Sequence, residues 1–236
     1  MSKTKPARMA TLLLLAALLM GCGKKPAEET DSGKKPTEVI DSAKKPIEEI
    51  DFGTVANSVY TNHFLGMTVN IPKDWSIQDK DAQDRLKQLG EKIVTGEDKN
   101  MQAIVKASEL QTVSLFAAFK FPYGSPVAFN PSVMSVAENV RQFPGIKTGK
   151  DVLFQVKQML ESGQLTMSFS KDSYTKKLGG VDFDVLESET TVRNLVVKQK
   201  YFVTLIKGYS LSIVATYMTD EDLDSVQKIL DSVTFK

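Results

Sequence analysis

Cysteine, histidine and tryptophan each occur once in this chain of 236 residues, as Cys22, His63 and Trp75. One cysteine excludes an internal disulfide, and one histidine excludes a two-histidine metal site and the metalloprotease motif HExxH. The sequence also lacks a P-loop, a GxGxxG motif and a GxSxG nucleophile elbow. We therefore expect no metal site, no cofactor and no catalytic residues of these kinds.

An excess of either charge is also lacking. The sequence has 30 Lys and Arg residues against 29 Asp and Glu residues, a net charge of +1 at pH 7. Three of the basic residues lie in the N-terminal segment that we expect to be removed. Nothing in this balance attracts nucleic acid, so no nucleic-acid partner is expected. A hydrophobic content of 42% is ordinary for a globular protein, and one core is the simplest interpretation.

Residues 1–21 have the three parts of a signal peptide. A basic start is followed by the apolar run LLLLAALLM and by the small residue Gly21. The run is too short to span a bilayer, which takes about 20 residues. The next feature, Leu19-Met20-Gly21-Cys22, resembles the lipobox of bacterial lipoproteins, although Met20 is bulkier than the usual alanine or serine.

The lipobox resemblance implies diacylglycerol on the sulfur of Cys22, cleavage before Cys22 and acylation of the new amino group. The membrane is then a partner through these chains, since a single acyl chain binds only marginally. Gly23 stands where an aspartate favours retention in the inner membrane in lipoproteins of two-membrane bacteria. The expected location is therefore the cell membrane or the outer membrane, with the domain facing the periplasm or the cell exterior. The alternative is a free thiol at Cys22, after an uncleaved anchor.

A ten-residue sequence repeat occurs three times between Lys24 and Gly53, as KKPAEETDSG, KKPTEVIDSA and KKPIEEIDFG. The proline in each copy prevents a continuous helix, and the apolar residues are too few to offset the entropy of ordering. We expect residues 22–53 to be a lipidated cysteine followed by a disordered linker with a mean span of about 30 Å. Binding of the paired lysines to anionic lipid is the alternative, which the carboxylates in every copy weaken.

Residues 54–236 are predicted to form one α+β domain, with a largely antiparallel sheet and flanking helices. Alternation predicts a strand up to Ile71 and a meander after residue 165, with turns at 179–180, 193–194 and 207–208. Apolar spacing predicts a helix over 80–95 that stops at Gly96 and resumes towards Ser108. A central strand over 111–121, helices after Thr148 and Thr219 and a last short strand, SVTF, complete the domain.

Three phrases give this domain a family resemblance. FLGMTVNIPKDW stands near its start, FNPSVMSVAENV is followed by PGIKTGKDV in the middle, and ILDSVTF stands near its end. These phrases resemble the PsbP-like (Mog/PsbP-like) α/β domains of bacterial lipoproteins, over residues 57–236. The resemblance implies an α/β sandwich with an accessory or binding role, and it fixes no activity.

A few single residues are candidates for a site. His63 is expected to be a solvated side chain beside a turn. Asp79, Asp81 and Asp84 lack the glycine and terminal glutamate of a calcium loop and are expected to begin a helix. Trp75 is expected to cover the core beside the sheet.

The loop KFPYGSPVAFNPS, residues 120–132, is the candidate for recognition. Three prolines, a glycine and the aromatic residues Tyr123 and Phe129 are typical of a semi-rigid loop that carries contacts on a stable scaffold. We interpret Tyr123 and Phe129 as a partner-contact patch. The alternative is that the loop only connects two strands.

Two functions remain from the sequence. The first is a membrane-anchored envelope lipoprotein, not an enzyme, whose domain binds an envelope protein or small ligand or assists assembly. The second is an envelope hydrolase that uses carboxylates. Two buried, unpaired carboxylates that converge in one cleft would favour the hydrolase.

Overall fold

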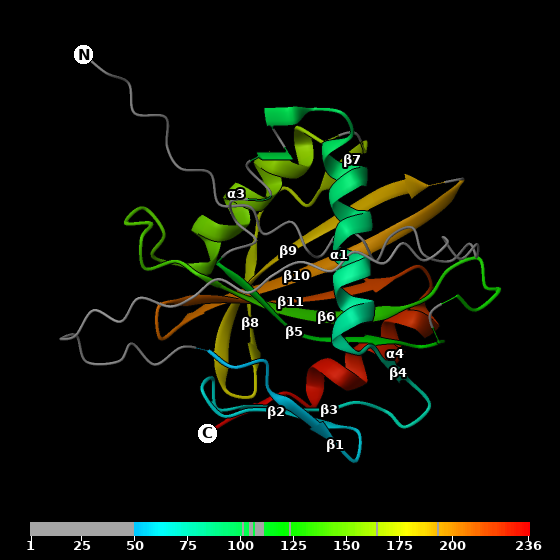
Figure 1. Ribbon diagram of the computed structural model, residues 1–236, viewed down its shortest axis with the longest axis vertical. Coiled ribbons are helices and arrows are strands. Elements are labelled where there is room, and N and C mark those ends of the chain that lie inside the picture. Colours follow the sequence, from blue (N-terminus) through cyan, green and yellow to red (C-terminus); the bar gives the residue numbers. More distant parts are fainter. Residues whose placement is uncertain are drawn as a thin grey trace, which may run out of the picture.

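The computed structural model describes residues 50–236, except 101, 104, 105, 107–110, 123, 164 and 193. The predicted signal peptide, Cys22 and the repeats up to residue 49 lie outside the described residues. Within them, the chain forms a four-stranded sheet and an eight-stranded sheet, and every strand pair is antiparallel (Figure 1). The predicted α+β fold with a largely antiparallel sheet is confirmed.

The large sheet forms the centre of the domain. Its strands run in the order β4-β5-β6-β11-β10-β9-β7. Strands β7 and β8 both pair with the same edge of β9, β7 with residues 188–190 and β8 with residues 181–185. Their bounds are β4 (Ser76–Ile77), β5 (Thr112–Phe119), β6 (Ser132–Asn139), β7 (Met167–Phe169), β8 (Tyr174–Leu178), β9 (Val181–Val192), β10 (Leu195–Ile206) and β11 (Tyr209–Tyr217).

The small sheet joins the two ends of the described chain. Its order is β1-β2-β3-β12, so the last strand pairs with the third. The bounds are β1 (Thr54–Ala56), β2 (Val59–Asn62), β3 (Met67–Asn70) and β12 (Thr234–Phe235). The predicted strand that ends near Ile71 and the predicted last strand are therefore neighbours in one sheet.

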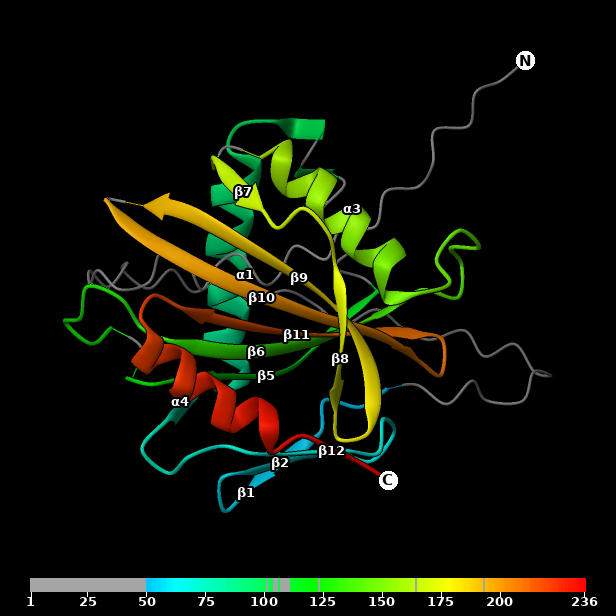
Figure 2. The ribbon, with the colours of Figure 1, turned by 180° about the vertical axis from the view of Figure 1, so that it is seen from behind.

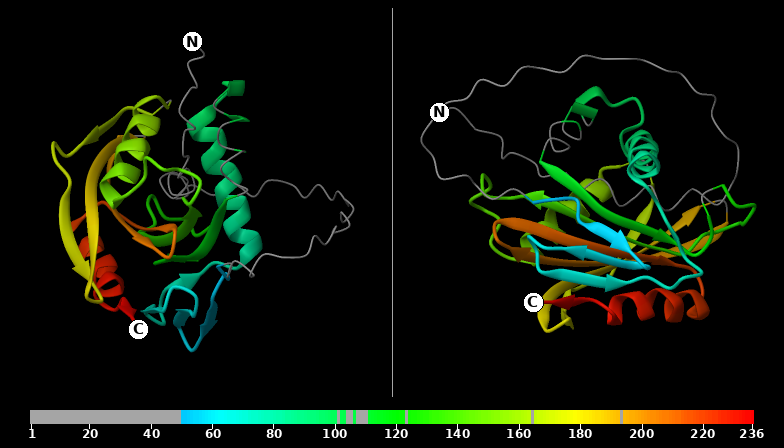
Figure 3. Two further views of the ribbon diagram at one scale, coloured as in Figure 1. Left: turned by 90° about the vertical axis from the view of Figure 1, so that its left-hand side faces the viewer. Right: turned by 60° about the horizontal axis from the view of Figure 1, so that its bottom comes forward.

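Helices lie on both faces of the large sheet. The helices α1 (Lys80–Thr95) and α3 (Gly149–Glu161) cover one face, while α4 (Asp220–Asp231) and the small sheet cover the other (Figures 2 and 3). One core cluster fills each face, and both clusters take side chains from β5, β6, β9, β10 and β11. Three layers thus bury the central strands on both sides.

Local capping signals explain where these helices begin. Asp79 Oδ1 accepts a hydrogen bond from the Ala82 amide at 2.8 Å and caps α1. At the start of α3, Thr148 and Asp151 form the predicted capping box, and Thr219 forms one with Asp222 at the start of α4. These side chains satisfy backbone N–H groups that the first helical turn leaves without partners.

The packed domain begins before residue 54. The side chain of Ile50 is buried in the core on the α4 side. Asn62 Nδ2 donates to the Asp51 carbonyl oxygen at 2.9 Å, and the Tyr60 hydroxyl donates to the Phe52 carbonyl oxygen at 3.1 Å. Residues 50–53, which the sequence assigns to the linker, therefore already belong to the fold.

A row of buried polar side chains crosses the face of the large sheet under α1 and α3. Ser132, Thr216, Gln199 and Ser188 are cross-strand neighbours on β6, β11, β10 and β9. Gln199 Nε2 donates to Thr216 Oγ1 at 3.0 Å, and the Tyr201 hydroxyl donates to Gln199 Oε1. The hydroxyl of Ser132, at the β6 end of the row, has no hydrogen-bond partner in the described part.

Candidate functional site

The structure places the candidates from the sequence in separate regions. His63 is exposed in the turn between β2 and β3, and Trp75 is buried in the core on the α4 side, as expected. Asp79 caps α1 and Asp84 pairs with a lysine one turn away, so these aspartates begin a helix, as predicted. Phe129 is half-buried and packs against the core under α1 and α3, so only part of its ring is available to a partner.

Two further candidates cannot be placed. Cys22 and Tyr123 lie outside the described residues. Lipidation of Cys22 and a partner contact at Tyr123 and Phe129 therefore stay predictions.

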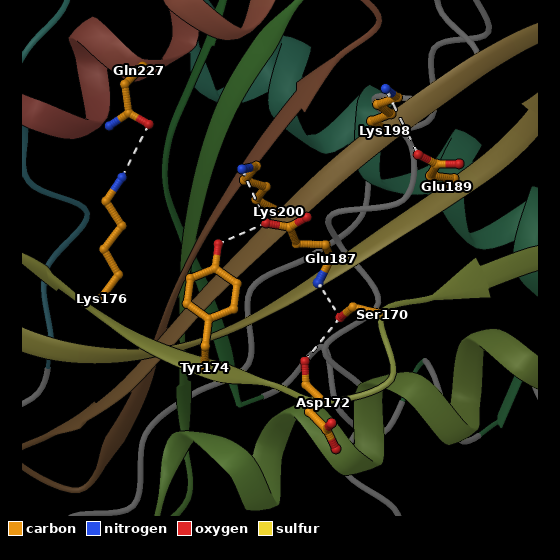
Figure 4. A network of polar contacts seen from close by, with 9 residues as sticks. All are labelled: Ser170, Asp172, Tyr174, Lys176, Glu187, Glu189, Lys198, Lys200 and Gln227. Carbon is orange, nitrogen blue, oxygen red and sulfur yellow. Dashed lines mark hydrogen bonds and ion pairs between the residues drawn. The ribbon is translucent and has the colours of Figure 1, made fainter.

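A cluster of charged and aromatic side chains lies on the long hairpin of β9 and β10 (Figure 4). Glu187 is the cross-strand neighbour of Lys200, and Glu189 is the neighbour of Lys198. The nitrogen-to-oxygen distances of these two ion pairs are 3.1 Å and 3.9 Å. We call this cluster, with Tyr174 and Val196, the ladder face.

Strand β8 adds the aromatic part of the ladder face. The Tyr174 hydroxyl donates to Glu187 Oε1 at 2.8 Å, so Glu187 has one partner from β8 and one from β10. The segment before β8 is fixed to the same residue, because the Ser170 amide donates to the Glu187 carbonyl oxygen at 2.9 Å. Lys200 Nζ also lies 5.9 Å from the centre of the Tyr217 ring.

The electrostatics of the ladder face shift the pKa values of Glu187, Tyr174 and Tyr217. Burial acts to raise the pKa of Glu187, but the hydrogen bonds from Tyr174 and Lys200 outweigh it and lower that pKa. Burial and the Glu187 carboxylate raise the pKa of Tyr174, and burial and the same carboxylate raise the pKa of Tyr217 to about 12. Near neutral pH, Glu187 is therefore ionised and both tyrosines are protonated.

This arrangement suits contact better than proton transfer. A general acid or base works best with a pKa near the operating pH, and the shifts at the ladder face move Glu187 and Tyr174 away from it. The charges are already paired within the hairpin, while Tyr174 is 40% exposed and Val196 is 46% exposed. Exposed aromatic and apolar surface with charged groups around it is typical of a protein-contact surface.

A signal in the sequence could have identified the ladder face. The sequence predicts a two-residue turn at 193–194, and the turn of a hairpin sets which residues of its two strands lie opposite each other. That register places Glu187 opposite Lys200 and Glu189 opposite Lys198. The contact from Tyr174 carried no comparable signal, because the pairing of β8 with β9 had to be known first.

The described residues give no support to a metal site or to a pair of buried carboxylates. They contain no group of three His, Cys, Asp or Glu side chains that could hold a metal ion. Glu138, on β6, is the one buried carboxylate among them, and it has an interaction partner. Also within these residues, no helix has the length and apolar character needed to cross a membrane.

Comparison with known proteins gives similarity to solved structures alone. No protein-family model matches the chain, and no curated protein matches it in sequence. The chain is similar to the solution structure of cyanobacterial PsbP (CyanoP) from Synechocystis sp. PCC 6803, with 13% identity and a TM-score of 0.46 over 78% of this chain and 96% of that one.

A second similar structure is that of LpqN, which is involved in cell envelope biogenesis of Mycobacterium tuberculosis. The identity is 16% and the TM-score 0.42, over 72% of this chain and 83% of LpqN. At these values the similarities say nothing about the activity of the chain.

Proposed function

We propose that this chain is a lipid-anchored protein of the cell envelope whose folded domain acts by binding and not by catalysis. One sequence pattern carries the proposal: an apolar run that leads into Leu19-Met20-Gly21-Cys22 is followed by three proline-containing repeats, and the packed domain after them includes Ile50. A lipid anchor, a spacer and a domain in this order hold a binding module at a membrane surface.

The ladder face supports binding over hydrolysis. Glu187 is held ionised by Tyr174 and Lys200, so it cannot act as a general acid, and its lowered pKa makes it a weak general base. We assign the ladder face as the main contact surface for an envelope protein. The loop with Phe129 and Tyr123 is a second candidate surface.

Lipid labelling tests the anchor. The Cys22→Ser chain should incorporate no fatty acid, because the acceptor sulfur is gone, while Met20→Ala should label at least as well as the wild-type chain, because it brings the lipobox closer to its usual pattern. Mass spectrometry of the mature protein from cells should show an N-terminal, acylated Cys22. An unmodified Cys22 thiol in that material would contradict the anchor.

Photo-crosslinking in intact cells tests the contact surface. A crosslinking amino acid at Val196, on the ladder face, should give a discrete product with one envelope protein. The matched control is Phe154, which is also exposed but lies on α3, on the other side of the large sheet. Equal products from both positions, or none from position 196, would reject the ladder face as the contact surface.

A further inference from the structure

Two cations are held on aromatic rings at the end of the large sheet that carries the turn between β10 and β11. The Arg141 guanidinium carbon lies 4.7 Å from the centre of the Tyr209 ring, and Lys207 Nζ lies 5.1 Å from the centre of the Phe64 ring. The two rings contact each other edge to face, with 5.4 Å between their centres. Arg141, Tyr209, Phe64 and Lys207 therefore form one continuous group, which we call the cation pair site.

Backbone contacts fix the positions of both cations. Arg141 Nη2 donates to the Lys207 carbonyl oxygen at 2.6 Å, and Lys207 Nζ donates to the Phe64 carbonyl oxygen at 2.6 Å. Gly208 has a φ of +82°, and a Cβ added there would lie 2.5 Å from Arg141 Nε. Arg141 therefore lies directly against the turn, in a position that any larger residue at 208 would disturb.

Neither cation is neutralised by a carboxylate within the described residues. The ion pairs found there involve neither Arg141 nor Lys207, and both residues are exposed. Guanidinium has five N–H donors, of which the contact with the Lys207 carbonyl uses one. Asp51 Oδ1 accepts from the Gly53 amide at 2.7 Å and from Asn62 Nδ2 at 3.0 Å, and Asp51 takes part in none of these ion pairs. The cation pair site thus has free donors for an anion.

The cation pair site lies where the chain from the membrane anchor enters the domain. Asn62 holds the Asp51 backbone and stands directly before the turn that carries Phe64. Figures 1 and 2 show the start of the described chain, the turn between β2 and β3 and the turn between β10 and β11 at the same end of the molecule. The end that receives the linker is therefore the end that presents the two cations.

We propose that Arg141 and Lys207 contact the phosphate groups of anionic lipids in the membrane that holds Cys22; this rests on the proposed anchoring. A guanidinium binds two phosphate oxygens at once, and an ammonium adds a second point of contact. Each cation strengthens binding to an anionic surface by about fivefold. Two cations give a free protein only weak affinity for a membrane. For a tethered protein this affinity is sufficient for contact, because a short flexible tether gives an effective concentration in the millimolar range.

Vesicle sedimentation of a chain without acyl groups tests this contact directly. The chain from residue 22 to residue 236 carrying Cys22→Ser is mixed with phosphatidylcholine vesicles, with and without phosphatidylglycerol, at millimolar lipid, which replaces the effective concentration that the tether would give. We expect the chain to bind only the anionic vesicles, and we expect this affinity to fall as salt is added. In the double variant Arg141→Gln with Lys207→Gln, the affinity should fall by about fivefold for each charge removed. The control, Lys73→Gln with Lys171→Gln, removes the same charge at exposed positions elsewhere and should lose little.

Charge-conserving variants separate a lost contact from a lost fold. Arg141→Lys with Lys207→Arg should keep most of the vesicle binding, and thermal melts should show that all variants are folded. Equal losses in the two Gln pairs, or equal binding of the wild-type chain to neutral and anionic vesicles, would overturn the contact site. Because no acyl chain is present, this result is independent of whether Cys22 is lipidated.

Discussion

The Tyr174 hydroxyl and Lys200 Nζ both contact Oε1 of Glu187, at 2.8 Å and 3.1 Å. One carboxylate oxygen thus joins β8 to the hairpin of β9 and β10 and sets the charge around two tyrosines. Removal of this charge should be visible in the titration of those tyrosines.

We expect Glu187→Gln to shift the tyrosine titration to lower pH, because the Glu187 charge raises the pKa of Tyr174 and of Tyr217, in each case after burial. Ultraviolet absorbance of tyrosinate measures this shift. Glu161→Gln, which removes a carboxylate paired with Lys157 on α3, is the control and should leave the curve unchanged. An unchanged curve for Glu187→Gln would contradict the arrangement of the ladder face.

The same tyrosines predict how stability depends on alkaline pH. Burial and then the Glu187 carboxylate raise the pKa of Tyr217 from its ordinary value of 10.0 to about 12 in the folded chain. Because the folded state binds this proton more tightly than the unfolded state, its contribution to stability is complete below pH 10 and is lost as pH rises from 10 to 12. Tyr217→Phe should make the fall in melting midpoint over this range less steep, and an unchanged slope would contradict the raised pKa.

The buried polar row predicts opposite effects for two neighbouring substitutions. Ser132→Ala should raise the free energy of unfolding by about 1 kcal/mol, because it removes a buried hydroxyl that has no partner in the described part. Thr216→Val should lower it by about 1–3 kcal/mol, because Gln199 Nε2 then loses its acceptor. Urea unfolding measures the free energy of unfolding of both variants. A lower value for Ser132→Ala than for the wild-type chain would show that the Ser132 hydroxyl has a hydrogen-bond partner.

Gly149 should not tolerate a side chain. A Cβ at this position would lie 2.3 Å from the Val203 carbonyl oxygen and 2.9 Å from Asp184 Oδ2. Gly149→Ala must therefore move α3 away from β10, at a cost of about 1–3 kcal/mol. Gly145→Ala is the matched control, because a Cβ there meets no atom within 4 Å. Thermal melts that place both variants at the same midpoint would contradict the close approach of α3.

Limited trypsin digestion tests the linker. In the chain from residue 22, cleavage should occur first after Lys24, Lys34 and Lys44, because a disordered repeat is accessible while the proline after the second lysine of each pair protects that bond. The stable product should begin at Lys45, shortly before the buried Ile50. Early cleavage after Lys73 instead, with the repeats protected, would reject a disordered linker.

Sequence signals that act over short distances predicted much of the fold. The helix caps at Thr148 and Thr219 and the turns of the C-terminal meander depend on residues within four positions of one another, and the structure has them at the predicted places. The apolar face of β11, from Tyr209 to Tyr217, was also predicted, because alternation is a local pattern.

Features that depend on distant strands were not predicted. The alternation in β11 placed Ser210, Ser212 and Thr216 on the second face, but it could not show that α1 and α3 bury that face as well. The contact of Arg141 with Tyr209 joins separate elements and leaves no periodic signal. The start of the domain at Ile50 was missed because a single apolar residue in a charged repeat has no pattern of its own.

The pairing of β3 with β12 affects the order in which the chain can fold during its synthesis. Thr234 of β12 is the neighbour of Thr68 on β3, and just before β12 Ser232 Oγ accepts from the Asn70 amide at 3.0 Å, across a separation of 162 residues. At roughly 5–20 residues per second, the ribosome needs about 8–32 seconds to supply that partner. Until then the nascent chain cannot complete the small sheet that buries Met67 and Val69, so this part of the domain can close only when almost the whole chain has been synthesised.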